Sequence, residues 1–301
     1  MRGVVRDSTL KRVPLVTIFD FVGLDTTSRN PLEWIAVQLA NWYSVRLVRR
    51  LPRLFDLTLM VGEKADVPDR PFGFLLPNRR ELTKAVIEFI GYVCPFEPGD
   101  YRDRTDLRRR LGYGPEPLVI CSIGGTSVGK PLLELCGRTF PLLQRNIRSV
   151  NMVVVCGPRL AADGLRLPKG IEVKGYVHRL YEHLAACDLA IVQGGGTTTL
   201  ELTALRRPFI YFPLEGHFEQ RIHVAGRIQR HRAGIQLEFG HTTPEQLASA
   251  VLSNLGTEVS YPAIATTGAR KAAELITEIL EQNLGSQSTD RFQGDTLHAD
   301  A

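Results

Sequence analysis

A run of glycines and threonines that ends in a glutamate is the part of the sequence best suited to bind a ligand. The apolar residues 189–192 before it predict a buried strand, and residues 199–205 predict a helix. Gly194, Gly195 and Gly196 let the backbone turn sharply and approach a ligand closely. The free N–H groups and the positive dipole end of the helix start favour a phosphate. The pattern therefore predicts a phosphate site at this strand-to-helix turn.

Thr197, Thr198 and Glu201 add hydrogen-bonding side chains to this turn. The threonine hydroxyls can donate to a phosphate. Glu201 lies about one helical turn further on and faces the same mouth. Its carboxylate would repel a phosphate but can accept hydrogen bonds from a ribose diol. We interpret the motif as a nucleotide diphosphate site; the alternative is a plain strand-to-helix turn, since short glycine motifs also occur without a ligand.

A polar loop follows the next predicted strand. This apolar strand ends at Pro213, and the loop after it carries His217, Glu219 and Gln220. Ligands of open α/β sheets bind at the carboxyl ends of parallel strands. We therefore expect this loop to lie beside the glycine turn, where its side chains are able to bind a sugar.

Residues 177–225 resemble the donor-binding half of a GT-B glycosyltransferase. They are most similar to family 28, which holds the N-acetylglucosaminyltransferase that makes lipid II, and more distantly to the UDP-glucuronosyltransferases. The resemblance covers roughly residues 118–280. It is carried by Gly175-Tyr176-Val177, Ala185-Ala186-Cys187-Asp188-Leu189, the glycine–threonine run with Glu201, and the segment from Pro213 to Gln220.

The resemblance implies an inverting, metal-independent transfer of a hexosyl group from a UDP-sugar to an acceptor, with no cofactor besides the donor substrate. It assigns the ribose to Glu201 and the base edge to the backbone at Val177. It assigns binding of the donor sugar to Glu219 and Gln220. It assigns binding of the diphosphate to Gly195, Gly196, Thr197 and Thr198. The absence of an obvious Asp-x-Asp motif from the sequence agrees with a metal-independent route.

A second glycine cluster follows the apolar strand predicted at residues 117–123. Gly129-Lys130 resembles the end of a nucleoside triphosphatase phosphate loop, but Pro131 stands where a Ser or Thr hydroxyl must bind Mg²⁺. In the GT-B relatives, a glycine-rich loop at this point faces the donor phosphates. The resemblance therefore adds Gly124, Gly125 and Thr126 to the predicted donor site.

Strands and helices alternate through the second half of the chain, which predicts a parallel sheet with helices on both faces. The predicted fold is α/β and GT-B-like: a Rossmann-type doubly wound parallel sheet with a partial amino-terminal α/β domain. The predicted domains are an acceptor-side domain at 1–94, a linker rich in Pro, Gly and charge at 95–117, a donor-binding domain at 118–284 and a disordered tail at 285–301.

The amino-terminal part predicts few elements: a strand at 13–21, a helix at 32–51 and a strand at 57–61. It lacks the glycine-rich strand–turn that opens a full GT-B amino-terminal domain. The domain is naturally minimal, truncated, or completed by a partner chain; we favour an incomplete or split enzyme. The catalytic base normally comes from this domain. None stands out; the candidates are His217, Asp20 and Asp25, while His178 and His223 are expected to be structural.

The five scattered cysteines have no metal-ligand spacing and indicate reduced thiols in a cytoplasmic protein.

The sequence carries a net charge of +5, and Trp34, Trp42 and Tyr43 share a predicted helix with several arginines. The common interpretation of such charge is a solvated face. The alternative is peripheral contact with anionic lipid at the inner face of the membrane, which would suit a lipid-linked acceptor. No nucleic-acid recognition motif is present in the sequence.

Three functional hypotheses follow from these patterns. The first is a UDP-sugar-dependent transferase that acts on a lipid-linked or small-molecule acceptor. The second is a non-catalytic nucleotide-sugar-binding subunit that needs a partner chain. The third is an epimerase that acts on UDP-N-acetylglucosamine with the same fold.

Overall fold

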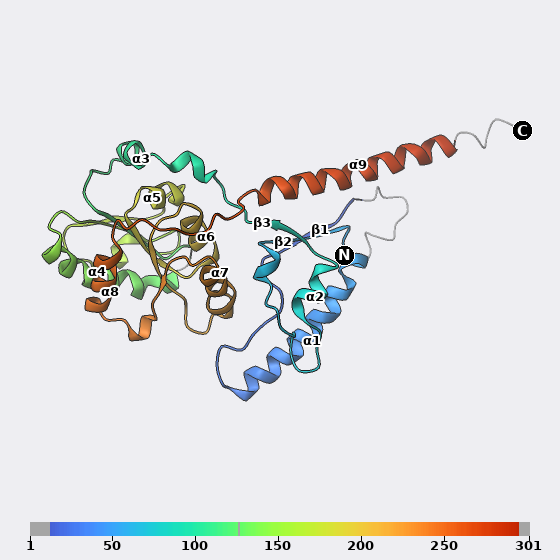
Figure 1. Ribbon diagram of the computed structural model, residues 1–301, viewed down its shortest axis with the longest axis horizontal. Coiled ribbons are helices and arrows are strands. Elements are labelled where there is room, and N and C mark those ends of the chain that lie inside the picture. The colour runs from blue at the N-terminus through green and yellow to red at the C-terminus, as the bar shows by residue number, and fades with distance from the viewer. Residues whose placement is uncertain (1–12, 126, 295–301) are drawn as a thin grey trace, which may run out of the picture. The chain divides into compact units, whose positions relative to one another are not determined.

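The computed structural model describes residues 13–125 and 127–294 (Figure 1). The chain forms two compact units. The first unit combines the chain up to Val93 with the chain from Ala265 onward, and the second comprises Cys94–Ile264.

The described part of the second unit contains a six-stranded parallel sheet in the order β6-β5-β4-β7-β8-β9. Its strands are β4 (Leu118–Ser122), β5 (Asn151–Val155), β6 (Ile171–Lys174), β7 (Leu189–Gln193), β8 (Phe209–Phe212) and β9 (Ile235–Gln236). Strands are added outward from β4 in one direction and then from β7 in the other, as in the Rossmann fold. The prediction of a doubly wound parallel sheet is confirmed, and its switch point lies between β4 and β7.

Six α-helices flank this sheet within the described residues. They are α3 (Arg104–Leu111), α4 (Lys130–Asn146), α5 (Leu180–Ala186), α6 (Gly196–Ala204), α7 (Ala225–Arg230) and α8 (Pro244–Asn254). The sequence Thr243-Pro244-Glu245-Gln246 predicts a capped helix start, with Thr243 as the cap and Gln246 closing a capping box. The start of α8 confirms this prediction: the Thr243 N–H donates to Gln246 Oε1 over 2.9 Å, and the Gln246 N–H donates to Thr243 Oγ1 over 3.3 Å.

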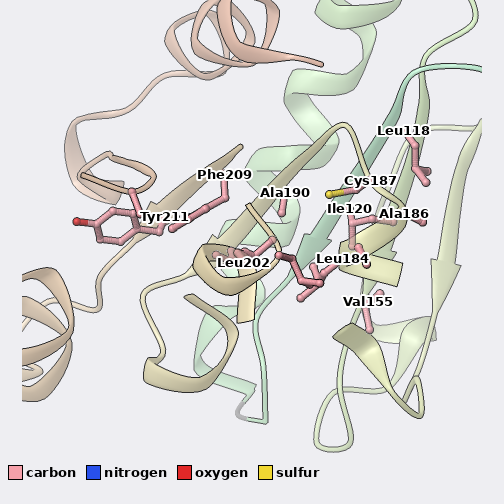
Figure 2. Packing of buried hydrophobic residues seen from close by; sticks show 14 of the residues in the cluster. Leu118, Ile120, Val155, Leu184, Ala186, Cys187, Ala190, Leu202, Phe209 and Tyr211 are labelled. Atoms are coloured by element: carbon pink, nitrogen blue, oxygen red, sulfur yellow. The ribbon is translucent and has the colours of Figure 1, made fainter. Parts of the chain in front are cut away.

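Alternating strand residues divide the core of this unit into two layers, because successive side chains point to opposite faces of a sheet. Leu118 and Ile120 pack on the face covered by α5 and α6 (Figure 2). Val119 and Cys121 pack on the opposite face, against α4 and α8. The strands are buried on both faces, which explains their nearly continuous apolar sequences.

The first unit has a three-stranded parallel sheet, β1-β2-β3, among the described residues. Its strands are β1 (Val16–Phe19), β2 (Leu57–Val61) and β3 (Glu88–Gly91), and its helices are α1 (Pro31–Leu54), α2 (Arg79–Lys84) and α9 (Gly268–Gly294). The two predicted strands and the long predicted helix are present. Residues of α1 and β2, among them Val45, Leu51 and Met60, form its small core.

The expected linker at 95–117 is instead part of the folded second unit. Within it, α3 buries Leu107 in the core. The Arg108 guanidinium donates to Asp188 over 2.5 Å, and Arg104 also pairs with this carboxylate. The arginine-rich sequence resembles a solvated linker because the buried carboxylate that pairs with it lies some 80 residues further on.

The bounds of the donor-binding domain expected at 118–284 and of the tail expected at 285–301 also differ from those in the structure. The chain leaves the second unit after Ile264, and Lys271 Nζ of α9 donates to the Phe89 carbonyl of the first unit over 2.7 Å. The helix continues through residues 285–294 of the expected disordered tail, since no proline interrupts it and propagation costs less than nucleation. Residues 295–301 lie outside the described part of the chain.

Asp188 joins α3, β4 and the start of β7. Its carboxylate also accepts the Leu118 N–H over 2.7 Å. Burial alone would raise the pKa of Asp188, but this bond and the two guanidinium groups outweigh burial and hold the pKa below its usual value. The ionised carboxylate therefore stabilises the fold above the unfolded-state pKa, and this contribution is lost as the pH falls through the folded-state value.

We expect Asp188→Asn to lower the free energy of unfolding at pH 7 by about 3 kcal/mol, because Arg108 would remain buried without its counterion. Urea unfolding measures this change, and the difference from the wild type should shrink in acid. Asp106→Asn is the matched control, because Asp106 pairs with Arg109 and Arg110 on the surface and should contribute under about 1 kcal/mol. Equal effects of the two substitutions would contradict the assignment.

Candidate functional site

A cavity of about 540 Å³ lies at the carboxyl edge of the six-stranded sheet. The ends of β4 and β5 line it, together with the loop after β6 and the starts of α5 and α6. Six of the residues predicted for the donor site line this one cavity: Gly124, Gly125, Val177, Thr197, Thr198 and Glu201. The cavity lies at the switch point, where ligands of doubly wound sheets bind.

The start of α6 offers uncapped backbone N–H groups to this cavity. Gly195 is the N-cap residue, and no side chain caps the helix among the described residues. A Cβ added to Gly195 would meet nothing within 4 Å, so the backbone faces open space here. The first N–H groups of a helix have no intrahelical partner, and they suit an anion. Thr199 instead bonds within the helix, its Oγ1 donating to the Gly195 carbonyl over 2.8 Å.

Gly194 has a packing role. A Cβ at this position would lie 2.9 Å from Pro213 Cα, so only glycine lets the turn after β7 pass this close to the end of β8. Gly194 is also absent from the residues that line the cavity.

Glu201 is the unusual side chain of the site. It is 7 % exposed, and its carboxylate has no hydrogen bond or ion pair to any described residue. Burial raises its pKa to about 7, because a charged carboxylate loses its hydration without gaining a partner. It is a buried acceptor that faces the cavity and can be satisfied by hydroxyl donors of a ligand.

The loop after β4 contributes Ser122, which the sequence analysis missed. Ser122 is buried, lines the cavity and accepts the Gly124 N–H over 3.3 Å. Its hydroxyl proton remains available to a ligand. The sequence signal that could have identified Ser122 is its place at the end of a strand, two residues before Gly124. Thr126, the third predicted residue of this loop, lies outside the described residues.

Glu219 and Gln220 lie beside this cavity and do not line it. The expected loop is a π-helix here (Glu219–Val224). Such turns are rare, and they are frequently found at functional sites. The side-chain oxygen Oε1 of Gln220 accepts the Leu214 N–H over 2.9 Å, which leaves the side-chain amide N–H groups for a ligand. Glu219 Oε1 would lie 3.8 Å from a Cβ placed on Gly196, so it borders the start of α6.

Of the three candidates for a catalytic base, His217 belongs to the same unit as this cavity but does not line it, whereas Asp20 and Asp25 belong to the first unit. His217 and Asp20 are exposed. Asp25 accepts two hydrogen bonds from Arg79, each of 2.8 Å, and pairs with Arg70. Burial alone would raise the pKa of Asp25, but the two arginines outweigh it and lower the pKa, which makes Asp25 a weak base.

The wall of the cavity around Val177 carries further polar groups. Tyr176, His178 and Arg179 all line it. Arg179 has a φ of 54°, in the left-handed region that non-glycine residues seldom adopt. Such backbone strain is frequent at binding sites, and the sequence did not reveal it. Across the described residues, no group of three or more His, Cys, Asp and Glu side chains is arranged to hold a metal ion.

Comparison with known proteins agrees with this geometry. Residues 119–279 match the glycosyltransferase family 28 C-terminal domain. An uncharacterized glycosyltransferase of Methanopyrus kandleri is 26% identical over 255 residues, which cover 84% of this chain and 68% of the relative. A UDP-N-acetylglucosamine–N-acetylmuramyl-(pentapeptide) pyrophosphoryl-undecaprenol N-acetylglucosamine transferase of Carboxydothermus hydrogenoformans is 26% identical over 203 residues, covering 63% and 53%.

Among solved structures, the glycotransferase of kitacinnamycin superposes with a TM-score of 0.51 at 15% identity. The match covers 92% of this chain and 69% of the other. It supports a shared GT-B fold. The chain spans only about half to two thirds of the length of the relatives that it matches.

The raised pKa of Glu201 predicts a pH-dependent stability. Between about pH 4.5 and 7 the folded state binds more protons than the unfolded state. The free energy of unfolding therefore falls as the pH rises through this window, by at most about 3 kcal/mol. Glu201→Gln cannot ionise, so we expect it to be more stable than the wild type at pH 8 and nearly equal at pH 5. Urea unfolding at both pH values measures this, and parallel profiles would contradict a raised pKa.

Proposed function

The chain belongs to glycosyltransferase family 28, and from this membership we propose that it transfers a hexosyl group from a UDP-sugar to an acceptor. We further propose that the transfer inverts the anomeric centre and needs no metal ion. The observation that carries the proposal is Glu201, a buried carboxylate without a partner among the described residues, in a cavity beside an uncapped helix start.

The ribose of the donor is the group that suits Glu201. Two vicinal hydroxyls can donate to the two carboxylate oxygens, which stabilises the ionised form and offsets the cost of burial. The base would then lie toward Val177 and Tyr176, on the same wall of the cavity. The nucleotide preference for UDP is supported by the relatives of known reaction, which are named for a UDP-sugar donor.

The diphosphate would bind at the start of α6 and against the loop of Gly124 and Gly125. During transfer, the acceptor oxygen forms a bond to the anomeric carbon while the bond from this carbon to the phosphate oxygen breaks. The electron pair stays on the leaving diphosphate. Fixed N–H groups and a helix dipole stabilise this added negative charge without reorganisation, and this is the basis for proposing metal independence.

The proton of the acceptor hydroxyl must pass to a base. Asp25 is a poor choice, because Arg79 and Arg70 hold its pKa low. Asp20 and His217 remain candidates, and both are exposed.

The first test is calorimetric titration of the purified chain with UDP, GDP and ATP in the presence of EDTA. We expect UDP to bind, and Glu201→Ala to weaken this binding about 10- to 100-fold, since hydrogen bonds to a charged group contribute about 1.5–3 kcal/mol. Glu215→Ala, which removes an exposed carboxylate from the loop after β8, is the matched control and should bind UDP like the wild type.

The outcomes separate the three hypotheses. Binding of none of the nucleotides would contradict a donor site. UDP binding followed by release of UDP from UDP-N-acetylglucosamine only when an acceptor is added would support the transferase. UDP binding without transfer to any acceptor would favour a non-catalytic subunit that needs a partner chain. Formation of a C2 epimer of the sugar would favour an epimerase.

The acceptor is proposed to be lipid-linked, as the name of the Carboxydothermus relative indicates for that protein. A lipid-linked acceptor would require contact with a membrane surface.

The face of α1 turned away from the core carries exposed Leu39, Trp42 and Tyr43 and, further along, Arg46 and Arg50. A groove of about 440 Å³ on this helix is lined by three arginines. Apolar and basic side chains on one helix suit an anionic membrane surface. No helix of the described residues is long and apolar enough to cross a bilayer, so contact would be peripheral.

Sedimentation with vesicles tests this surface. We expect more binding to vesicles with about 30% phosphatidylglycerol than to pure phosphatidylcholine, since each basic residue near an anionic surface adds about 1 kcal/mol. Replacement of Arg46, Arg50 and Arg53 by Gln should lower binding to the anionic vesicles about 100-fold. The control replaces Arg109 and Arg110, two exposed arginines of α3, by Gln. Equal binding to both vesicle types would contradict the proposal.

A further inference from the structure

Arg227 lies against the start of α6. It belongs to α7, which follows the π-helix Glu219–Val224 directly. Its Nη2 donates to the carbonyl of Gly196, the first residue of α6, over 2.8 Å. The side chain is partly buried, so the guanidinium is held at this place by both packing and a hydrogen bond.

In this position the guanidinium of Arg227 lies beside the positive end of the α6 dipole. The amino-terminal end of a helix carries a partial positive charge, so a cation beside it is repelled, whereas an anion is attracted. A guanidinium placed here becomes favourable when a further anion binds at the helix start. The carboxylate of Glu219 offsets part of the positive charge of Arg227. A Cβ placed on Gly196 would lie 3.8 Å from Glu219 Oε1 and 3.5 Å from Arg227 Nη2, so both groups border the start of α6.

A second observation points to a ligand at the same helix. Glu201 is more than nine-tenths buried, faces the cavity and has no partner among the described residues. A ligand that satisfies Glu201 with hydroxyl groups and also carries phosphates would bring two or more negative charges toward Glu201 and Glu219. The helix dipole alone is equivalent to only about half a charge, so such a ligand needs a further cation.

We propose that Arg227 is the positioning residue that supplies this charge: it fixes the first turn of α6 through Gly196 and favours the diphosphate of the donor. The inference rests on the proposed function. As the bond between the anomeric carbon and the phosphate oxygen breaks, the leaving diphosphate gains the electron pair, and the guanidinium favours this product. A guanidinium stays protonated throughout the physiological pH range.

Two other cations near the site are less suited to this role. The Arg179 side chain is 59% exposed and lies 3.5 Å from Glu182. Lys130 Nζ lies 3.8 Å from Glu134. Neither has a hydrogen bond to the first turn of α6 among those described, whereas Arg227 does.

The experiment is calorimetric titration of UDP, UMP and uridine against the wild type, Arg227→Met, Arg227→Lys and Arg221→Met, with EDTA present. Arg221 belongs to the π-helix that directly precedes α7 and lies 3.6 Å from Glu238, which makes it the matched control. We expect Arg227→Met to weaken UDP binding about 10- to 50-fold and uridine binding less than twofold. Arg227→Lys should recover part of the loss, and Arg221→Met should bind like the wild type.

A purely structural role would give a different pattern. If Arg227 only held α6 in place, uridine, UMP and UDP would weaken together, because Glu201 lies on the same helix, and this result would overturn the inference. Unchanged UDP binding in Arg227→Met would overturn it as well. If Arg227→Met fails to fold, Arg227→Lys takes its place. A loss of UDP affinity without a loss of uridine affinity in Arg227→Lys would support the inference, and an equal loss of both would overturn it. A wild-type chain that binds uridine and UDP with equal affinity would also refute the role of Arg227, whereas one that binds no nucleotide would refute the proposed function itself.

Discussion

The parallel pairing of β4 with both β5 and β7 is the constraint on which the site depends. Ser122 is in register with Val155 on one side and with Val192 on the other. The three strands therefore end at the same level, and their loops emerge at one edge of the sheet. Because β5 and β7 continue the sheet in opposite directions, the loops after them diverge and leave a cavity at the switch point. An antiparallel neighbour for β4 would send one of these loops to the opposite edge.

Glycines at this edge fall into two groups with different physical roles. A Cβ on Gly157 would lie 2.2 Å from the Gly124 carbonyl oxygen, and Gly194 is similarly confined by Pro213. These glycines let neighbouring loops pack closely. Gly125 and Gly195 face open space instead, with nothing within 4 Å of an added Cβ, and they leave room for a ligand. The sequence motif alone does not separate the groups, since both follow buried strands.

The sequence predicted those parts of the fold that local rules determine. Apolar runs predicted strands such as β4, β7 and β8 of the second unit but not the two-residue strand β9, and the pattern Thr243-Pro244-x-Gln246 predicted the start of α8. Long-range pairing was not predictable. The arginines of α3 looked solvated because Asp188, their partner, is far along the chain. The resemblance implied that the last helix crosses back onto the first domain, but the predicted bounds kept residues 265–284 in the donor domain, whereas the chain returns to the first unit after Ile264.

The site was predicted to a similar extent. Glu201, Thr197 and Val177 could be placed from a motif and a resemblance, and they line one cavity. Ser122, the strained backbone of Arg179 and the guanidinium of Arg227 could not, because each depends on how separate segments meet. The π-helix at Glu219 was also missed, since an extra residue per turn leaves no clear periodicity in six residues.

Two buried carboxylates in the second unit show how environment separates structural from binding residues. Asp188 and Glu201 are almost equally buried, at 8 and 7 % exposure. Asp188 has a backbone N–H and two guanidinium groups as partners, and its pKa is lowered. Glu201 has no such partners among the described residues, and burial raises its pKa to about 7. A fold selected only for stability would pair or replace the second carboxylate, because an unpaired buried charge is costly. Its retention beside an open cavity is therefore best explained by a ligand that completes its hydrogen bonds.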